Sequence, residues 1–182
     1  MPIEPYRGVS PTIDPTAYVH PSAVIIGDVH IGAYSSIWPG VVIRGDVNFI
    51  RIGARSNIQD GSILHVTRPT AEHPQGIPLL IDADVTVGHQ VSLHACHLQA
   101  RSMVGIGAIV LDGVVVEEEA MVGAGSLVAP GKRVLRGELW LGSPAKAVRV
   151  LDEKARRAIA ATTENYVRLA MEYRQAALDG PQ

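Results

Sequence analysis

The sequence has very little cysteine and phenylalanine, no long hydrophobic run and no excess of one charge. A single cysteine, Cys96, excludes an internal disulfide and suits a reducing compartment. Lys and Arg total 16 against 18 Asp and Glu, which gives a net charge of −2. This charge provides no strong electrostatic attraction for nucleic acid or an anionic membrane. No stretch approaches the roughly 18 to 20 apolar residues of a membrane span, and the N-terminal residues show no signal peptide. We therefore expect a cytoplasmic protein without nucleic-acid or membrane partners.

The residues that are abundant indicate many short strands. The chain of 182 residues is long enough for one well-buried domain with a tail. It contains 18 Gly and 12 Pro, with many Val and Ile but one Phe. This composition is typical of tight turns and short strands around a thin core.

Aliphatic residues recur every six positions along most of the chain. The period is interrupted twice and slips by one residue before Leu98, yet every repeat position is Ile, Val or Leu. An antiparallel meander is the alternative, but it would require two-residue hairpin signals that are missing between the segments. The repeat positions are Ile13, Val19, Ile25, Ile31, Ile37, Ile43, Ile52, Ile58, Leu64, Ile81, Val87, Leu93, Leu98, Val104, Val110, Val116, Val122, Val128 and Val134.

Such hexapeptide repeats resemble those of left-handed parallel β-helices, in which three repeats form one triangular coil. We therefore predict an all-β fold, a left-handed parallel β-helix over residues 1–140 with a loop excursion at 66–80. Glycine often follows the repeat residue, as in Ile31-Gly32 and Ile52-Gly53. It suits a turn with positive φ or a close backbone approach.

Residues 141–182 read as a linker and a C-terminal α-helix packed along the β-helix. Leu151 to Leu178 is rich in Ala, Glu, Lys and Arg, and Asp152 is a plausible N-cap. The stripe expected to pack on the β-helix is Ala155, Ile159, Thr162, Tyr166, Leu169, Tyr173 and Ala177.

The repeat numbering aligns side chains on successive coils. Residues three repeats apart lie on the same side of the prism, roughly 4.8 Å apart. Ile43, Leu64 and Leu93 are related in this way, provided that the gap from Leu64 to Ile81 is a single step with a loop. The residues that follow them form an outward-facing column of Arg44, His65 and His94. Two imidazoles with the same offset on neighbouring coils can converge on one divalent metal ion.

His89 follows the repeat residue Val87 by two positions and therefore lies on a different side of the triangle. One coil below it, Asp60 has the same offset and Gln59 precedes it. If three prisms pack about a threefold axis, the first column of one subunit faces this second column of its neighbour, and His89 completes the metal site. Arg44 would then meet a carboxylate such as Asp60 across the interface.

Exposed polar histidines without any ligand role are the simpler alternative. Three histidines in matching register favour the metal site, with His65, His89 and His94 as ligands. Cys96 is interpreted as structural, and the remaining histidines are interpreted as surface or turn residues: His20, His30, His73 and His97.

Three segments together resemble the gamma-class carbonic anhydrase family, and more closely its short bacterial members, some of which are called hexapeptide transferases. They are Arg44-Gly-Asp-Val-Asn-Phe-Ile-Arg-Ile-Gly53, Asn57-Ile-Gln-Asp-Gly-Ser-Ile-Leu-His65 and Val87-Gly-His-Gln-Val-Ser-Leu-His94. The resemblance extends over nearly the whole chain, including Leu-Gly-Ser-Pro-Ala145 and the terminal helix.

The resemblance implies a homotrimer with Zn²⁺ or Fe²⁺ between subunits and reversible hydration of carbon dioxide to bicarbonate. It also implies an interface pair of Arg44 and Asp60, buttressed by Asp46. Gln59 and Asn57 would lie near the bound water. Tyr166 matches an aromatic residue of the terminal helix that reaches toward the site.

The sequence departs from well-characterised active members where they carry proton-transferring glutamates. Those positions are Val47 and Arg68 here, so we expect slow regeneration of hydroxide unless His97, His73 or Tyr166 substitutes. Two other functions stay open. One is an acyl-coenzyme A acetyltransferase or thioesterase of the hexapeptide-repeat superfamily, and the other is a non-catalytic trimer held together by metal.

Overall fold

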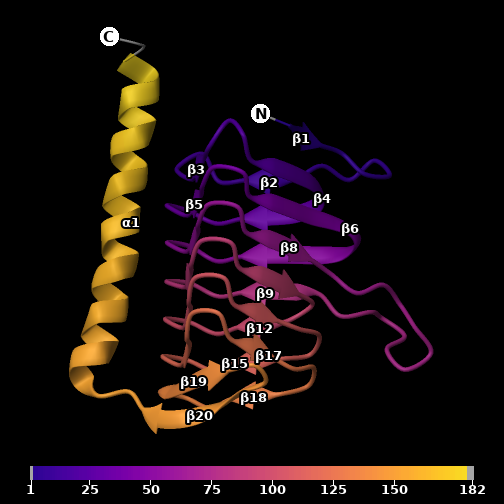
Figure 1. Cartoon of the computed structure of the whole chain (residues 1–182). Coiled ribbons are helices and arrows are strands. Elements are labelled where there is room, and N and C mark those ends of the chain that lie inside the picture. The colour runs from indigo at the N-terminus through magenta and orange to yellow at the C-terminus, as the bar shows by residue number, and fades with distance from the viewer. Residues whose placement is uncertain (1, 180–182) are drawn as a thin grey trace.

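The computed structural model describes residues 2–179, which form a column of stacked coils with one long helix alongside (Figure 1). Each coil contributes short parallel strands to the sides of a triangular prism. This is the predicted left-handed β-helix of hexapeptide repeats. No described helix is both long and apolar enough to cross a membrane.

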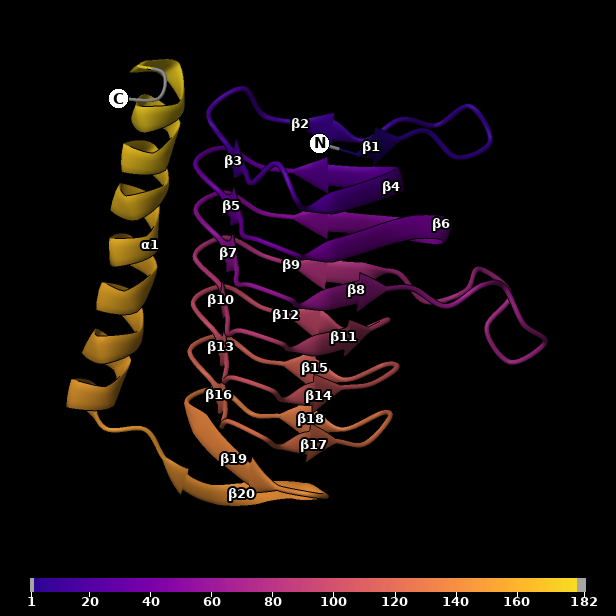
Figure 2. The same cartoon turned by 45° about the horizontal axis from the view of Figure 1, so that its top comes forward.

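The three sides are formed by strands that pair with the next coil (Figure 2). Side 1 contains β2 (Thr12–Ile13), β9 (Leu79–Ile81), β12 (His97–Leu98), β15 (Val115–Val116) and β18 (Arg133–Val134). Side 2 contains β3 (Tyr18–Val19), β5 (Ser36–Ile37), β7 (Asn57–Ile58), β10 (Thr86–Val87), β13 (Met103–Val104), β16 (Met121–Val122) and β19 (Glu138–Gly142). Side 3 contains β1 (Ile3–Glu4), β8 (Ile63–His65), β11 (Ser92–His94), β14 (Ile109–Val110) and β17 (Leu127–Val128). The longer strands β4 (Val24–Ile31) and β6 (Val42–Ile52) begin on side 3 and end on side 1.

The repeat residues form the core. All of them are buried except Ile13 and Val19, which belong to the first coil and are partly buried against the others. A second set of mostly small residues, two positions before the repeat residues from Ile25 to Val128, is buried as well and was not predicted. Cys96 belongs to this set. It precedes Leu98 by two positions and so keeps the alternation after the one-residue slip.

The turns between the sides show which of the two predicted reasons for glycine applies, a positive φ or a close backbone approach. Gly53 does not have a positive φ, but a Cβ there would lie 2.6 Å from the backbone nitrogen of Ala83 on the next coil. Close approach is therefore the reason for glycine directly after a repeat residue. Positive φ occurs three residues after a repeat residue, as at Gly40 and Gly61. Arg55 occupies the same position after Ile52 and adopts a positive φ although it is not glycine.

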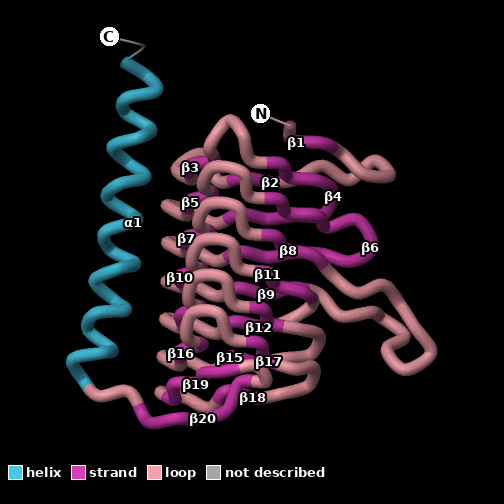
Figure 3. The backbone as a smooth tube through the Cα atoms, in the orientation of Figure 1, coloured by secondary structure: helices cyan, strands magenta, loops and turns pink. Residues whose placement is uncertain are grey.

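The excursion between β8 and β9 leaves the coil as a single loop (Figure 3). Ile52 of β6 pairs with Ile81 of β9, so the gap is one step of the helix, as the alignment of His65 and His94 requires. At the base of the loop, Thr67 and Ile77 form an antiparallel bridge. The Asn48 amide donates to the Thr67 carbonyl at 3.2 Å and so ties the loop to β6.

The last coil ends differently from the expected linker. β20 (Ala145–Val150) pairs antiparallel with β19 and covers the end of the prism. Apolar residues six apart give no sign of this strand, because it does not belong to the repeat.

The helix α1 (Glu153–Asp179) packs along side 2, where it contacts β3, β5, β7 and β10. The Asp152 carboxylate accepts from the Ala155 amide at 2.8 Å, so the predicted N-cap is present. The predicted stripe was partly wrong, because Leu169 is exposed. Tyr173 is also half exposed, but its ring packs on those of Tyr18 and Trp38, with centroids 5.7 and 5.2 Å away, so it contacts side 2 as predicted. The buried face is Ile159, Thr163, Val167 and Ala170.

This face is rotated by about one residue from the predicted one beyond Ile159. Side 2 presents the Thr86 hydroxyl to the helix, and Thr163 meets it at 3.0 Å. Hydrophobicity could not choose between Thr162 and Thr163, because the choice depends on a polar partner from another coil.

Candidate metal centre

His65 and His94 lie side by side on side 3. Their strands β8 and β11 pair in parallel with Leu64 opposite Leu93 and His65 opposite His94, which is the predicted register. Nδ1 of His65 lies 3.1 Å from Nε2 of His94. The two imidazoles therefore direct one nitrogen each at the same point.

The outer nitrogen of each ring is bound by a carboxylate. His65 Nε2 lies 3.0 Å from Asp46, and His94 Nδ1 lies 2.9 Å from Asp112. A carboxylate only accepts hydrogen bonds, so the outer nitrogens carry the protons and, in neutral rings, the inner nitrogens carry lone pairs. Two facing lone pairs repel, and a cation between them removes that repulsion. A divalent metal ion fits this donor set, since histidine ligands in metal sites usually donate their other N–H to a carboxylate.

The electrostatics of the site favour neutral ligands. Burial is the main cause that lowers the pKa of His65, and the positive charge of Arg44 adds to it. Burial opposes ionisation of Asp46, but hydrogen bonds from Arg44 and His65 outweigh it and lower the pKa of that carboxyl. An ionised Asp46 beside a neutral His65 is the combination that a metal site needs near neutral pH.

Arg44 is bound within its own chain rather than to Asp60. Its guanidinium pairs with Asp46, and its side chain stays 45% exposed at the surface of side 3. The pairing of Arg44 with Asp60 across an interface stays a prediction.

His89 lies on side 2, apart from the other two histidines. Its Nδ1 is 2.9 Å from Asp60, one coil below, so the predicted second column is formed. This hydrogen bond leaves Nε2 available, and the ring is 41% exposed. Within residues 2–179, no three side chains of His, Cys, Asp or Glu are arranged to hold a metal ion. One chain thus presents two separate parts of the proposed site.

Gln59 and Asn57 begin a buried chain of hydrogen bonds that ends on α1. The Gln59 amide donates to Asn57 Oδ1 at 2.9 Å, and the Asn57 amide donates to Thr86 Oγ1 at 2.9 Å. Thr86 in turn contacts Thr163, whose hydroxyl also lies 3.3 Å from the Ile159 carbonyl. These hydrogen bonds connect Gln59, which directly precedes Asp60 of the second column, with the C-terminal helix.

Tyr166 belongs to α1 and packs against side 2 of the prism. Its ring meets that of Trp38 edge-on, with centroids 5.5 Å apart, and it belongs to an aromatic cluster with Tyr18. Burial raises the pKa of Tyr166, and the negative charge of Asp60 contributes. The residue is therefore near the second column and not near the His65–His94 pair.

The other candidate residues have local roles. His97 binds Asp82 on side 1 at 2.9 Å, and His20 Nδ1 lies 2.8 Å from the Ser22 hydroxyl. Val47 is exposed on β6, and Arg68 lies on the excursion. Cys96 is buried, which raises its pKa and makes it a poor ligand.

Asp112 is the site residue that the sequence analysis missed. It follows the repeat residue Val110, one coil beyond His94 on side 3, by two positions. The repeat numbering contains this information, but the offset differs by one from that of the histidines. A search for identical offsets therefore passes over it.

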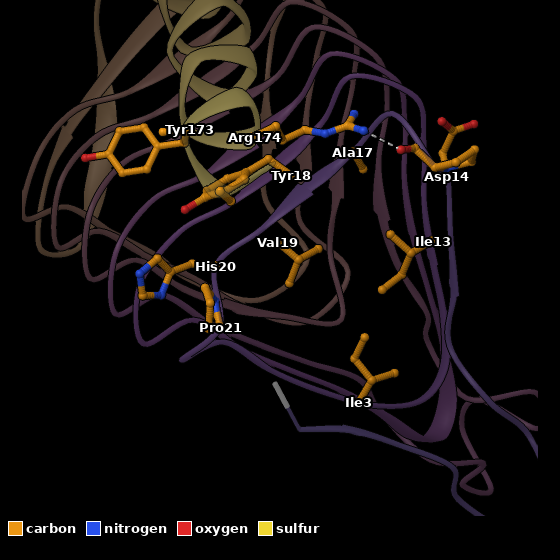
Figure 4. Close-up of a pocket in the computed structure, with 13 residues that line it drawn as sticks. Ile3, Ile13, Asp14, Ala17, Tyr18, Val19, His20, Pro21, Tyr173 and Arg174 are labelled. Carbon is orange, nitrogen blue, oxygen red and sulfur yellow. Dashed lines mark hydrogen bonds between the residues drawn. The ribbon is translucent and has the colours of Figure 1, made fainter. Parts of the chain in front are cut away.

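A separate cavity of about 740 Å³ opens at the first coil, beside the end of α1 (Figure 4). Ile3, Ile13 and Val19 line it from the prism, and Tyr173 and Arg174 line it from the helix. It contains none of the predicted metal ligands.

Comparisons with known proteins agree with the fold and show the family. Residues 10–45 match the family described as bacterial transferase hexapeptide (six repeats). A crystal structure of a hexapeptide transferase family protein from Anaplasma phagocytophilum superposes with a TM-score of 0.88 at 44% identity, covering 94% of this chain and 98% of that one. The chain belongs to the hexapeptide transferase family.

Its homologues within this family include gamma carbonic anhydrases. Protein YrdA of Escherichia coli is 48% identical over 94% of this chain and 93% of its own length. Gamma carbonic anhydrase 2, a mitochondrial protein of Arabidopsis thaliana, is 48% identical over 88% of this chain. The chain spans 58% of the length of that plant protein.

Proposed function

We propose that the protein is a metal-dependent enzyme of the gamma carbonic anhydrase type, which reversibly hydrates carbon dioxide to bicarbonate. The observation that carries the proposal is the pair of ring nitrogens of His65 and His94, 3.1 Å apart and each backed by a carboxylate. The similarity to a gamma carbonic anhydrase supports the reaction. Zn²⁺ is the proposed metal, with Fe²⁺ as the alternative under reducing conditions.

The proposed enzyme is a homotrimer in which His89 of the partner subunit supplies the third nitrogen. Support comes from the position of His89, which is on a different side from the pair and keeps Nε2 free. A metal site divided in this way has all three histidines only where two subunits meet. Arg44 and Asp60, exposed at the two columns, would pair across the same interface.

The residues of the chain would divide the chemistry as follows. When bound, a divalent metal supplies Lewis acidity that brings the pKa of water toward about 7. Asp46 and Asp112 keep the inner nitrogens of His65 and His94 unprotonated. Gln59 gives one N–H to Asn57 and retains its carbonyl oxygen and second N–H for hydrogen bonds to water or bicarbonate.

Proton release to solvent would limit the rate. Val47 and Arg68 cannot accept a proton from the site, and His97 is bound to Asp82 on another side of the prism. We expect turnover to rise with the concentration of an imidazole buffer, which would carry the proton instead.

The main competing function is acyl transfer from coenzyme A, or thioester hydrolysis, because the family is described as transferases. Such chemistry would use one histidine as a base and would need no facing pair. A trimer held together by metal without catalysis is the third possibility.

The deciding experiment is to measure metal content per chain together with stopped-flow hydration of carbon dioxide, on protein reconstituted separately with zinc and iron. About one metal per chain and turnover that chelation abolishes would support the proposed enzyme. Metal without turnover would favour the metal-held trimer or another substrate. Coenzyme A binding without metal would favour acyl transfer.

A further inference from the structure

Asp112 joins a proposed metal ligand to the excursion loop. One carboxylate oxygen lies 2.9 Å from His94 Nδ1, and the other accepts from the hydroxyl of Thr67. The two contacts occupy both oxygens, so the carboxylate cannot rotate without losing one of them.

Thr67 is itself held firmly. Its backbone forms two hydrogen bonds with Ile77, each of 3.0 Å, and its carbonyl accepts from the Asn48 amide. Asn48 also donates to the Gln75 carbonyl at 2.9 Å. The base of the excursion therefore provides a fixed anchor for Asp112.

The consequence concerns which nitrogen of His94 carries the proton. Free imidazole exchanges between two tautomers, and only one of them leaves Nε2 available toward His65. A carboxylate at Nδ1 selects that tautomer, because it can only accept. Without Asp112, His94 could carry its proton on Nε2. That proton would point at His65 Nδ1, and Nε2 would have no lone pair to bind a cation between the rings.

We propose that Asp112, anchored by Thr67, is a positioning residue that prepares His94 to bind a divalent cation of the zinc type. The inference rests on the proposed function for the identity of the cation. It extends that proposal by assigning the excursion between β8 and β9 a role in the site, through Thr67.

The test compares two carboxylates that bind histidine in the same way. Asp112→Asn is the test variant, and Asp82→Asn is the matched control, because Asp82 lies 2.9 Å from His97 on side 1 and is similarly exposed. Zinc affinity is measured by competition with a chromophoric chelator, with the assembly followed by sedimentation. Asp112→Asn should weaken zinc binding by about 10- to 100-fold, while Asp82→Asn should leave it unchanged.

Two further measurements keep the test decisive if Asp112→Asn folds or assembles poorly. Thr67→Val keeps every charge, and it should weaken zinc binding less than Asp112→Asn but more than Asp82→Asn. Nitrogen-15 NMR of metal-free protein should show the Nδ1–H tautomer of His94 in the wild type and in Asp82→Asn, and a mixture of tautomers in Asp112→Asn.

The outcomes separate this inference from the proposed function. Wild-type protein that binds no zinc would refute the proposed metal site. Wild-type protein that binds zinc, with equal affinities for the Asp112→Asn and Asp82→Asn variants and an unchanged His94 tautomer, would overturn the role of Asp112 alone.

Discussion

The two columns of side chains on side 3 and side 2 differ in how complete they are. On side 3, His65 and His94 contact each other and each has a carboxylate behind it. On side 2, His89 has its carboxylate, Asp60, but among residues 2–179 it belongs to no group of three potential metal ligands. The first column therefore holds two of the three proposed ligands in position, and the second column holds the third ligand, which needs a partner subunit. The comparison indicates that strand register positions two ligands within one chain, whereas the third ligand, His89, would reach the site only when subunits assemble.

The largest effect is expected from removing a ligand of the pair on side 3. His94→Ala should abolish tight metal binding and activity together, because a single imidazole remains on side 3. His97→Ala, outside both columns, is the control. The measurement is metal content after gel filtration, and normal metal content in His94→Ala would contradict the ligand assignment.

The interface between the columns should be the next most sensitive feature. Arg44→Ala should weaken the trimer by about 1 to 3 kcal/mol per interface, because Asp60 would lose its proposed partner. Sedimentation at decreasing protein concentration measures this effect. Arg51→Ala is the control, since Arg51 forms a similarly exposed pair with Asp28 at 2.7 Å. Equal dissociation of both variants would rule out the specific pairing of Arg44.

A smaller effect is expected from the buried chain behind the second column. Thr163→Val removes the hydroxyl that meets Thr86, and it should lower the free energy of unfolding by about 1 to 3 kcal/mol. Urea denaturation measures the change. Thr162→Val is the control, because the Thr162 hydroxyl donates to the Ala158 carbonyl of its own helix rather than to a residue of the prism. Equal losses in the two variants would show that the buried chain contributes nothing specific.

The smallest effect is expected at the cysteine, which belongs to neither column. Burial raises the pKa of Cys96, so little reactive thiolate exists at neutral pH. Ellman's reagent should label the folded protein slowly and the urea-unfolded protein at once. Cys96→Ala should keep the wild-type metal content, and loss of metal in this variant would add a sulfur ligand to the account.

The fold was predictable from the sequence because every coil uses the same rule. One aliphatic residue every six positions fixes the core and the register, and the register places His65 opposite His94. The pairing of His89 with Asp60 followed from the same numbering. The excursion was predicted at 66–80 and ends two residues earlier, because Leu79 and Leu80 already belong to β9. Its prolines, glycine and charges suit a loop that leaves the coil and returns.

The parts that escaped prediction depend on contacts between unlike elements. Strand β20 covers the end of the prism without repeating, and the buried face of α1 is set by a hydroxyl on Thr86. Asp112 escaped because its offset differs from that of His94, although its side chain reaches the same ring. Side-chain reach and polar partners are not periodic, so a repeat argument does not contain them.

The most direct test of a metal site shared between copies is to mix two inactive variants. His94→Ala subunits retain His89, and His89→Ala subunits retain the pair on side 3. After unfolding and refolding together in equal amounts, each mixed trimer should contain about one intact site, which restores roughly a quarter of the wild-type metal content. Each variant refolded alone should bind none. If the mixture also binds none while its trimers form normally, the three histidines do not form a site between subunits.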